Sequence, residues 1–185
     1  MNITVYCASS LGHDPDFAQE TRKLGAWIGA HRHTLVYGGT NVGLMGLLSD
    51  VVHDAGGRVV GVLPDILADR EPPPGCLTEF YRVETMAQRK AKMIELGDVF
   101  IALPGGPGTL EELSEIMSLV KLGTPPGYLF LLNINGYYDE LVASFERMLE
   151  HGFMTPEMRS YLKVAVSADE LAAALSVMGR GSARP

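Results

Sequence analysis

The fold is decided by one junction in the sequence, Val99-Phe100-Ile101-Ala102-Leu103-Pro104-Gly105-Gly106-Pro107-Gly108-Thr109-Leu110-Glu111-Glu112. It opens on a short apolar strand pattern, passes through a loop of small residues and enters a helical pattern. In an α/β protein such a junction binds phosphate, because glycines let the backbone approach a ligand and the first helical turn offers unpaired N–H groups. The dinucleotide fingerprint G-x-G-x-x-G fails here, since Glu112 stands in place of its third glycine. An acid beside a phosphate site suggests chemistry as well as binding.

Glu112 also has a purely structural interpretation. Thr109 and Glu112 have the T-x-x-E spacing of a capping box, in which the carboxylate reaches back to a backbone N–H at a helix start. Thr85 with Gln88 and Ser167 with Glu170 have the same spacing. Spacing alone therefore favours the structural role.

Strand-like and helix-like segments alternate along the chain. Asp14 and Pro15 mark the start of a helix that ends near Ala30, and Gly56 and Gly123 mark the ends of two others. This order predicts an α/β fold with a doubly wound parallel sheet, Rossmann-like and three-layered (α/β/α). We expect a single nucleotide-binding domain over residues 1–178 and a disordered tail over 179–185. The strand-like segments are short and β-branched or continuously apolar, and they cover residues 3–7, 34–37, 58–63, 99–103, 128–133 and 164–166.

Ligands in such folds bind at the carboxyl ends of the strands. We therefore expect Ser9, Ser10, Gly38 and Gly39 to converge with residues 105–109 on one edge of the sheet and to line the pocket. Met45 is expected in the core rather than in the pocket. Tyr137 and Tyr138, after Asn135 and Gly136, are expected to form a turn with an aromatic packing role.

Composition narrows the class of protein. The chain has 185 residues, 46% of them hydrophobic, and a formal net charge of −7 at pH 7, with no basic run, which argues against nucleic-acid binding. No apolar run reaches the length of a membrane span, and no secretory leader is evident, so we expect a cytoplasmic protein. The two cysteines and five histidines have no metal-ligand spacing, so we expect no metal and a buried thiol at Cys7.

A second motif, Met86-Ala87-Gln88-Arg89-Lys90, decides between the structural and the functional interpretation of Glu112. By itself it predicts a helix with a solvated charge pair at Arg89 and Lys90. Together with residues 103–112 and 37–46, it resembles the LONELY GUY (LOG) family of cytokinin riboside 5′-monophosphate phosphoribohydrolases, whose members are often mislabelled as lysine decarboxylases. The resemblance runs from residues 5–10 through residues 136–138 to residues 152–153, nearly the whole chain.

The resemblance implies the site residues. The catalytic pair falls on Arg89 and Glu112. The substrate contacts fall on Glu71, Arg89, Lys90, Gly106, Pro107, Gly108, Thr109, Leu110, Glu111, Glu112 and Ser118.

The chain departs from the family pattern at several places. Ala87 stands where the family usually has histidine, and Thr40 where it usually has a third glycine. Pro107 has no N–H and removes one phosphate donor, so the phosphate must rely on Gly106, Gly108 and Thr109. We expect these departures to bear on base selection and turnover.

The resulting prediction is an enzyme that hydrolyses the N-glycosidic bond of AMP or N6-modified adenine ribotides, giving free base and ribose 5-phosphate without a cofactor. Glu112 would stabilise an oxocarbenium-like state and orient water, and Arg89 would hold the ribose. The alternative is a nucleotide or molybdenum-cofactor carrier, which needs the loop but not the acid. Amino-acid decarboxylation needs a pyridoxal-phosphate lysine in a larger context than this chain suggests.

Two helical patterns carry more apolar residues than one buried face requires. Since LOG proteins are typically dimers that pair near this region, we expect a two-fold symmetric homodimer in which the partner closes each pocket. The apolar residues are Met86, Met93, Ile94, Leu113, Ile116, Met117, Leu119 and Val120.

Overall fold

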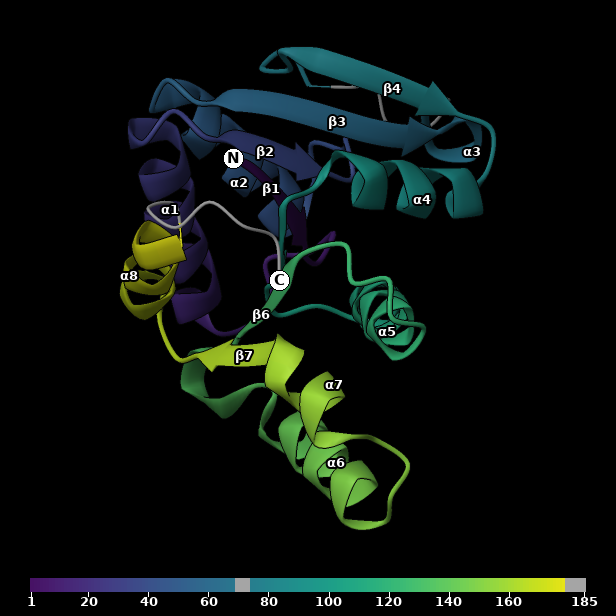
Figure 1. Cartoon of the computed structure of the whole chain (residues 1–185). Helices are drawn as coiled ribbons and strands as arrows, with labels where there is room; N and C mark the ends of the chain where they lie inside the picture. The colour runs from purple at the N-terminus through teal and green to yellow at the C-terminus, as the bar shows by residue number, and fades with distance from the viewer. Residues whose placement is uncertain (69–73, 179–185) are drawn as a thin grey trace.

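Seven strands form one sheet in the order β4-β3-β2-β1-β5-β6-β7 in the computed structural model, which describes residues 1–68 and 74–178 (Figure 1). Every neighbouring pair is parallel, which confirms the predicted doubly wound sheet. The strands are β1 Asn2–Tyr6, β2 Thr34–Tyr37, β3 Arg58–Pro64, β4 Glu79–Val83, β5 Val99–Ala102, β6 Tyr128–Leu132 and β7 Leu162–Ala165.

The strand order reverses between β1 and β5. From β1 the chain builds outward to β4, then returns to place β5 on the other side of β1, with Tyr6 opposite Ala102. The connections that leave these two strands therefore run to opposite sides of the sheet. Such a switch point opens a crevice at the carboxyl ends of the strands, where α/β proteins bind ligands.

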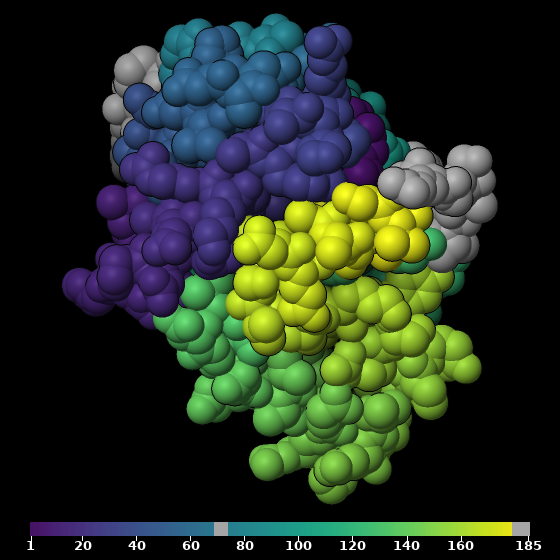
Figure 2. Space-filling view, turned by 90° about the vertical axis from the view of Figure 1, so that its left-hand side faces the viewer, coloured from purple at the N-terminus to yellow at the C-terminus, as the bar shows by residue number. Residues whose placement is uncertain are grey.

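Helices cover both faces of the sheet, as the three-layer prediction requires. The helices α1 Pro15–Ala30, α2 Gly43–Asp54 and α8 Ala168–Met178 share one hydrophobic cluster, and Figure 2 shows the purple α1 and yellow α8 packed side by side on that face. The helices α4 Met86–Leu96, α5 Pro107–Lys121 and α6 Asp139–Glu150 contribute to the cluster on the other face. The described residues also contain three short helices, α3 Asp65–Ala68, η1 Ile134–Gly136 and α7 Pro156–Tyr161.

Strand pleating divides the core between the two faces. In β6, Phe130 and Leu132 join the α1 side, whereas Leu129 and Leu131 join the α5 side. Successive side chains on a strand point to opposite faces, so a continuously apolar strand fills both layers. This is why the buried strands carry no polar alternation in the sequence.

Helix ends follow the sequence signals closely. Asp14 caps α1 by accepting the N–H of Asp16 at 2.9 Å, and Pro15 is the first helical residue, as predicted. Gly56 and Gly123 have φ of +84° and +72° just beyond α2 and α5, in the left-handed region that ends helices.

The edge strand β4 was not predicted from the sequence. Glu79 and Arg82 interrupt it, and its residues are exposed or half-buried. An edge strand is covered less than a central one, so it lacks the apolar run by which the other strands were recognised. The predicted strand at 164–166 is observed slightly earlier, as β7, and the predicted tail at 179–185 lies outside the described residues. Within the described ranges, no helix has the length and apolarity needed to cross a membrane.

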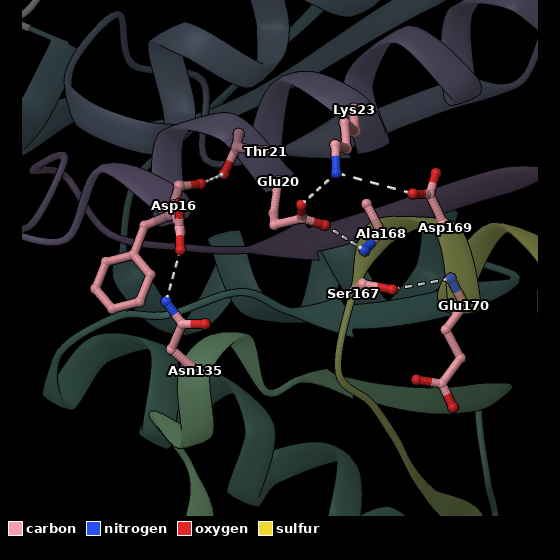
Figure 3. Close-up of polar contacts among 10 residues, drawn as sticks. Asp16, Glu20, Thr21, Lys23, Asn135, Ser167, Ala168, Asp169 and Glu170 are labelled. Atoms are coloured by element: carbon pink, nitrogen blue, oxygen red, sulfur yellow. Dashed lines mark hydrogen bonds and ion pairs between the residues drawn. The ribbon is translucent and has the colours of Figure 1, made fainter.

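A buried carboxylate joins α1 to α8 (Figure 3). Glu20 is 8% exposed; it accepts the N–H of Ala168 at 2.7 Å and the ammonium group of Lys23 at 2.7 Å. The N–H groups at a helix start have no partner within their own helix. Glu20 therefore supplies an acceptor that α8 cannot provide for itself.

We predict that Glu20→Ala lowers the free energy of unfolding by about 1–3 kcal/mol, because it leaves the buried N–H of Ala168 without an acceptor. Glu20→Gln keeps one acceptor oxygen and should lose less. Lys23→Ala is the matched control, since its exposed ammonium group contributes little. Urea titrations of the three variants measure the order, and equal losses for Glu20→Ala and Lys23→Ala would contradict this role.

Candidate active site

A pocket of about 400 Å³ lies at the carboxyl ends of the central strands. Its walls come from the segments that follow β1, β2 and β5 and from the first turns of α4 and α5, as the switch point implies. Sixteen residues line it: Cys7, Ala8, Ser9, Ser10, Thr40, Met45, Leu67, Met86, Arg89, Lys90, Gly106, Pro107, Gly108, Thr109, Glu111 and Glu112.

Most of the predicted site residues meet in this pocket. Ser9 and Ser10 line it together with Arg89, Lys90, residues 106–109 and the acids Glu111 and Glu112. Two other predicted residues are placed differently, and a third is not described. Leu110 and Ser118 do not line it, and the Ser118 hydroxyl donates to Ser114 O at 2.8 Å within its own helix. Glu71 lies outside the described residues.

Gly38 and Gly39 support the pocket instead of lining it. A Cβ atom on Gly38 would lie 1.8 Å from Nη2 of Arg89 and 2.9 Å from Sδ of Met45. Gly39 has a φ of +78°, in the left-handed region, and packs against Val62 and Leu63. Gly38 and Gly39 therefore do not line the pocket as expected. Instead, the missing side chain at Gly38 leaves room for the guanidinium group of Arg89.

Arg89 is buried, so the interpretation as a solvated charge pair is wrong for this residue. Thr85 caps α4 by accepting the N–H of Gln88 at 3.1 Å, and Arg89 follows in the first turn with 8% exposure. Its Nη1 lies 3.9 Å from Sδ of Met86, a weak acceptor. Its Nε finds no acceptor among the described residues. A buried guanidinium group with unused donors is prepared to bind an anionic or hydroxyl-rich ligand.

Lys90 is already neutralised by two acids of α5. Its Nζ lies 2.8 Å from Glu111 and 3.0 Å from Glu115. Hydrogen bonds from these two carboxylates raise the pKa of Lys90 above its usual value. The lysine therefore braces α4 against α5 as a permanent cation.

Glu112 is not a capping residue. The N-cap of α5 is Gly106 and the helix begins at Pro107, so Thr109 is already the third helical residue. At the two other places with this spacing, Thr85 accepts from Gln88 and Ser167 accepts from the N–H of Glu170 at 3.2 Å. The structural interpretation of Glu112 is therefore wrong, although the same pattern correctly marks both other helix starts.

The Glu112 carboxyl group is buried without a hydrogen-bonding partner. It is 9% exposed, and no hydrogen bond or ion pair reaches it from the described part of the chain. Burial raises its pKa from 4.5 to about 7, and the positive charge of Arg89 opposes this rise without cancelling it. A carboxylate held in this state in a cleft has the marks of a functional group.

The start of α5 offers backbone donors to an anion. The first bond within the helix runs from the N–H of Leu110 to Gly106 O at 3.2 Å, so the N–H groups of Gly108 and Thr109 precede the helical ladder. Pro107 has none. The loop before the helix folds onto Thr109, because a Cβ atom on Gly105 would lie 2.1 Å from its Oγ1. Glycine is therefore required at position 105.

Six lining residues were not predicted: Cys7, Ala8, Thr40, Met45, Leu67 and Met86. Cys7 and Ala8 directly follow β1 and could have been included with Ser9 and Ser10. The buried thiol expected at Cys7 is confirmed, and burial raises its pKa, so it is neutral at pH 7. Met45 belongs to the core, as predicted, but its sulfur also reaches the pocket, 3.7 Å from the hydroxyl of the buried Thr40.

Three of the unpredicted residues, Met45, Leu67 and Met86, add apolar side chains to the lining, and Met86 lies directly beside Arg89. Among the residues that the structure describes, no three His, Cys, Asp or Glu side chains are grouped to hold a metal ion.

Comparison with known proteins agrees with these features. A family model described as "Possible lysine decarboxylase" matches residues 45–175. The cytokinin riboside 5′-monophosphate phosphoribohydrolase LOG7 of Arabidopsis thaliana is 43% identical over 91% of this chain and 78% of its own length. LOG3 of the same plant, which has the same activity in its name, is 41% identical over 91% of this chain and 79% of its own.

Solved structures extend the likeness to the fold. The molybdenum cofactor carrier protein of Chlamydomonas reinhardtii superposes with a TM-score of 0.72 at 20% identity, covering 97% of this chain and 98% of that one. At this level of identity the likeness concerns the fold alone. The family match spans most of the chain and the plant relatives align over nearly all of it, so this chain belongs to the LONELY GUY (LOG) family.

Proposed function

We propose that this protein hydrolyses the N-glycosidic bond of adenine or N6-modified adenine nucleoside 5′-monophosphates, releasing the base and ribose 5-phosphate. The observation that carries the proposal is Glu112, a buried carboxyl group to which no described residue donates a hydrogen bond, in one pocket with Arg89 and a phosphate-binding helix start. Relatives at 41–43% identity are named for this activity.

The reaction explains why these groups belong together. When the base leaves with the bonding electrons, positive charge develops on the ribose, and a nearby carboxylate stabilises it. Water then adds to the anomeric carbon and loses a proton to Glu112, while the departing base takes up one proton from solvent water and is released neutral; the proton on Glu112 returns to solvent. The backbone N–H groups of Gly106, Gly108 and Thr109 hold the 5′-phosphate, so its binding energy orients the bond that breaks.

Arg89 positions the substrate from the other wall. Its guanidinium group lies against the backbone at Gly38, and its Nε, which no described residue accepts from, is a donor for ribose hydroxyl groups or phosphate. Its charge also favours the ionised form of Glu112. Lys90 supports this geometry as a brace between the two helices, through its ion pairs with Glu111 and Glu115.

The two other functions are less well supported. A carrier only has to bind its ligand, so the buried carboxyl group of Glu112 would have no function in it. A decarboxylase would need a lysine that forms a Schiff base; Lys90 is the one lysine that lines the pocket in the described chain, and its two carboxylate partners keep it protonated. A protonated amine is not a nucleophile.

We predict that Glu112→Gln reduces adenine release from AMP by about 10²-fold or more while leaving the affinity for AMP within a few-fold, because the amide cannot carry the stabilising charge. Glu111→Gln is the matched control: this neighbour also lines the pocket but is paired with Lys90, and turnover should fall far less. Chromatography of the released base and calorimetry with AMP measure the two effects. A wild-type protein that binds AMP and N6-substituted adenine ribotides but releases no base from them would favour the carrier.

We predict that Glu112→Gln also stabilises the protein, and more so at higher pH. Because the pKa of Glu112 in the folded protein is about 7, above its usual value of 4.5, the native state holds the extra proton between these values. Raising the pH through this window therefore lowers the free energy of unfolding. The variant lacks this titration, so its advantage should grow by on the order of 2 kcal/mol between pH 5 and 8. Urea titrations at both values test this, and a constant advantage would contradict it.

We propose, finally, that the protein forms a two-fold symmetric homodimer through α4 and the end of α5. Of the eight apolar residues on which the dimer prediction rests, five are buried in the chain's own core: Met93, Leu113, Ile116, Met117 and Val120. Apolar surface nevertheless remains at Met86, which is 41% exposed, and at Leu122, which is 74% exposed. Pairing along this surface would cover the mouth of the pocket beside Met86.

We predict that Leu122→Asp dissociates the dimer, because it places a charge in an apolar interface. Val177→Asp is the control, since Val177 is equally exposed, at 74%, but lies on α8 against the opposite face of the sheet. Light scattering at micromolar concentration measures both. A wild-type monomer of about 20.0 kDa with full activity would exclude the dimer and the shared pocket.

A further inference from the structure

Two tyrosine hydroxyl groups hold the phosphate-binding loop from behind. The hydroxyl of Tyr137 donates to Gly105 O at 2.8 Å, and that of Tyr138 donates to Leu103 O at 2.6 Å. Neither tyrosine lines the pocket. Both follow β6, which pairs with β5, so the loop that leaves β5 is fixed by the segment that leaves its neighbour.

The two hydrogen bonds act on different peptide groups. Gly105 O belongs to the same peptide group as the N–H of Gly106, the first candidate phosphate donor, whereas Leu103 O belongs to a peptide group whose nitrogen is that of Pro104 and carries no hydrogen. In a trans peptide group the C=O and N–H point in opposite directions. The Tyr137 hydroxyl therefore turns the N–H of Gly106 away from itself, and by polarising the peptide group it strengthens this donor.

Tyr137 is itself firmly positioned. Its ring meets Phe17 edge to face, with centroids 5.4 Å apart, and Tyr138 at 4.8 Å. The turn before it is held by Asn135, whose side-chain amide donates to Asp16 of α1 at 2.8 Å (Figure 3) and to Asp14 at 3.0 Å. The position of the hydroxyl is thus determined by α1 and η1 before any ligand binds.

We propose that Tyr137 is a positioning residue for the 5′-phosphate, acting through the peptide group between Gly105 and Gly106. The inference rests on the proposed function and deepens it. Tyr137 does not touch the substrate; it aims and strengthens one donor that does. Tyr138 bonds to Leu103 O, on a peptide group without an N–H, and lies near the backbone of Gly105; neither contact involves the N–H of Gly106, so it stabilises the end of β5 without such an effect on the phosphate.

The test compares Tyr137→Phe with Tyr138→Phe, which each lose one hydroxyl group. For Tyr137→Phe we expect the KM for AMP to rise about 3- to 10-fold, and the Kd for ribose 5-phosphate, measured by calorimetry, to rise by the same factor. This is the effect of losing about one hydrogen bond, here the bond from the N–H of Gly106 to the phosphate. The kcat should stay within about twofold, and the kcat/KM for adenosine, which has no phosphate, should not change. Tyr138→Phe should lower the Tm and leave the ratio of kcat/KM between AMP and adenosine unchanged.

Three results would overturn the proposal. The first is an unchanged Kd of Tyr137→Phe for ribose 5-phosphate, and the second is an equal effect of this variant on AMP and adenosine. The third is a wild-type protein that does not bind ribose 5-phosphate. Absence of turnover in the wild type would refute the proposed reaction alone, because the calorimetric comparison of the two variants decides the inference by itself.

Discussion

The burial of two opposite charges in one pocket is the constraint on which the rest of the site depends. Arg89 is 8% exposed and Glu112 is 9% exposed, so both have lost most of their hydration. Taking a charge out of water costs several kcal/mol unless partners replace the solvent. The neighbouring backbone makes room for Arg89: position 38 has no side chain, because the guanidinium group occupies that space.

Lys90 forms ion pairs with the neighbours of Glu112 and not with Glu112 itself, which leaves this carboxyl group available for the reaction. Three glutamates of α5 approach α4, and Lys90 takes Glu111 and Glu115, which are four residues apart and so share one face of the helix. Glu112, between them in sequence, has no ion pair within the described chain; burial raises its pKa to about 7, and the charges of Arg89 and Lys90 only partly oppose this rise. Had Lys90 contacted Glu112 directly, the pKa of this carboxyl group would lie far lower and the anion would already be satisfied. The carboxylate of Glu112 can therefore stabilise a positive charge that develops on the substrate only during the reaction.

The sequence predicted the sheet and most of the pocket because both depend on local patterns. Short apolar strands, Asp14 with Pro15 and the glycines beyond the helices are read within a few residues of each other, and strand order then brings Ser9 and Ser10 to the glycine loop. Burial was harder to predict, because it depends on contacts that are distant in sequence. The T-x-x-E spacing occurs three times and caps only two helices, and nothing local shows that Thr109 is already inside α5. The charged edge strand β4 was missed for the same reason.

Support for the phosphate loop comes from two tyrosines that lie 32 and 35 residues further along the chain than the loop residues they bond. Glycines give the loop the freedom to approach a ligand, and the same freedom would let its N–H groups point in many directions. The segment after β6 removes that freedom with two hydroxyl groups, and it is fixed in turn to the first turn of α1 through Asn135. Since α1 also carries Glu20, which caps α8, one helix connects the loop support to the C-terminal helix. A flexible motif is thereby made rigid by its surroundings, which lets a glycine-rich loop bind a ligand without first paying the entropy of ordering.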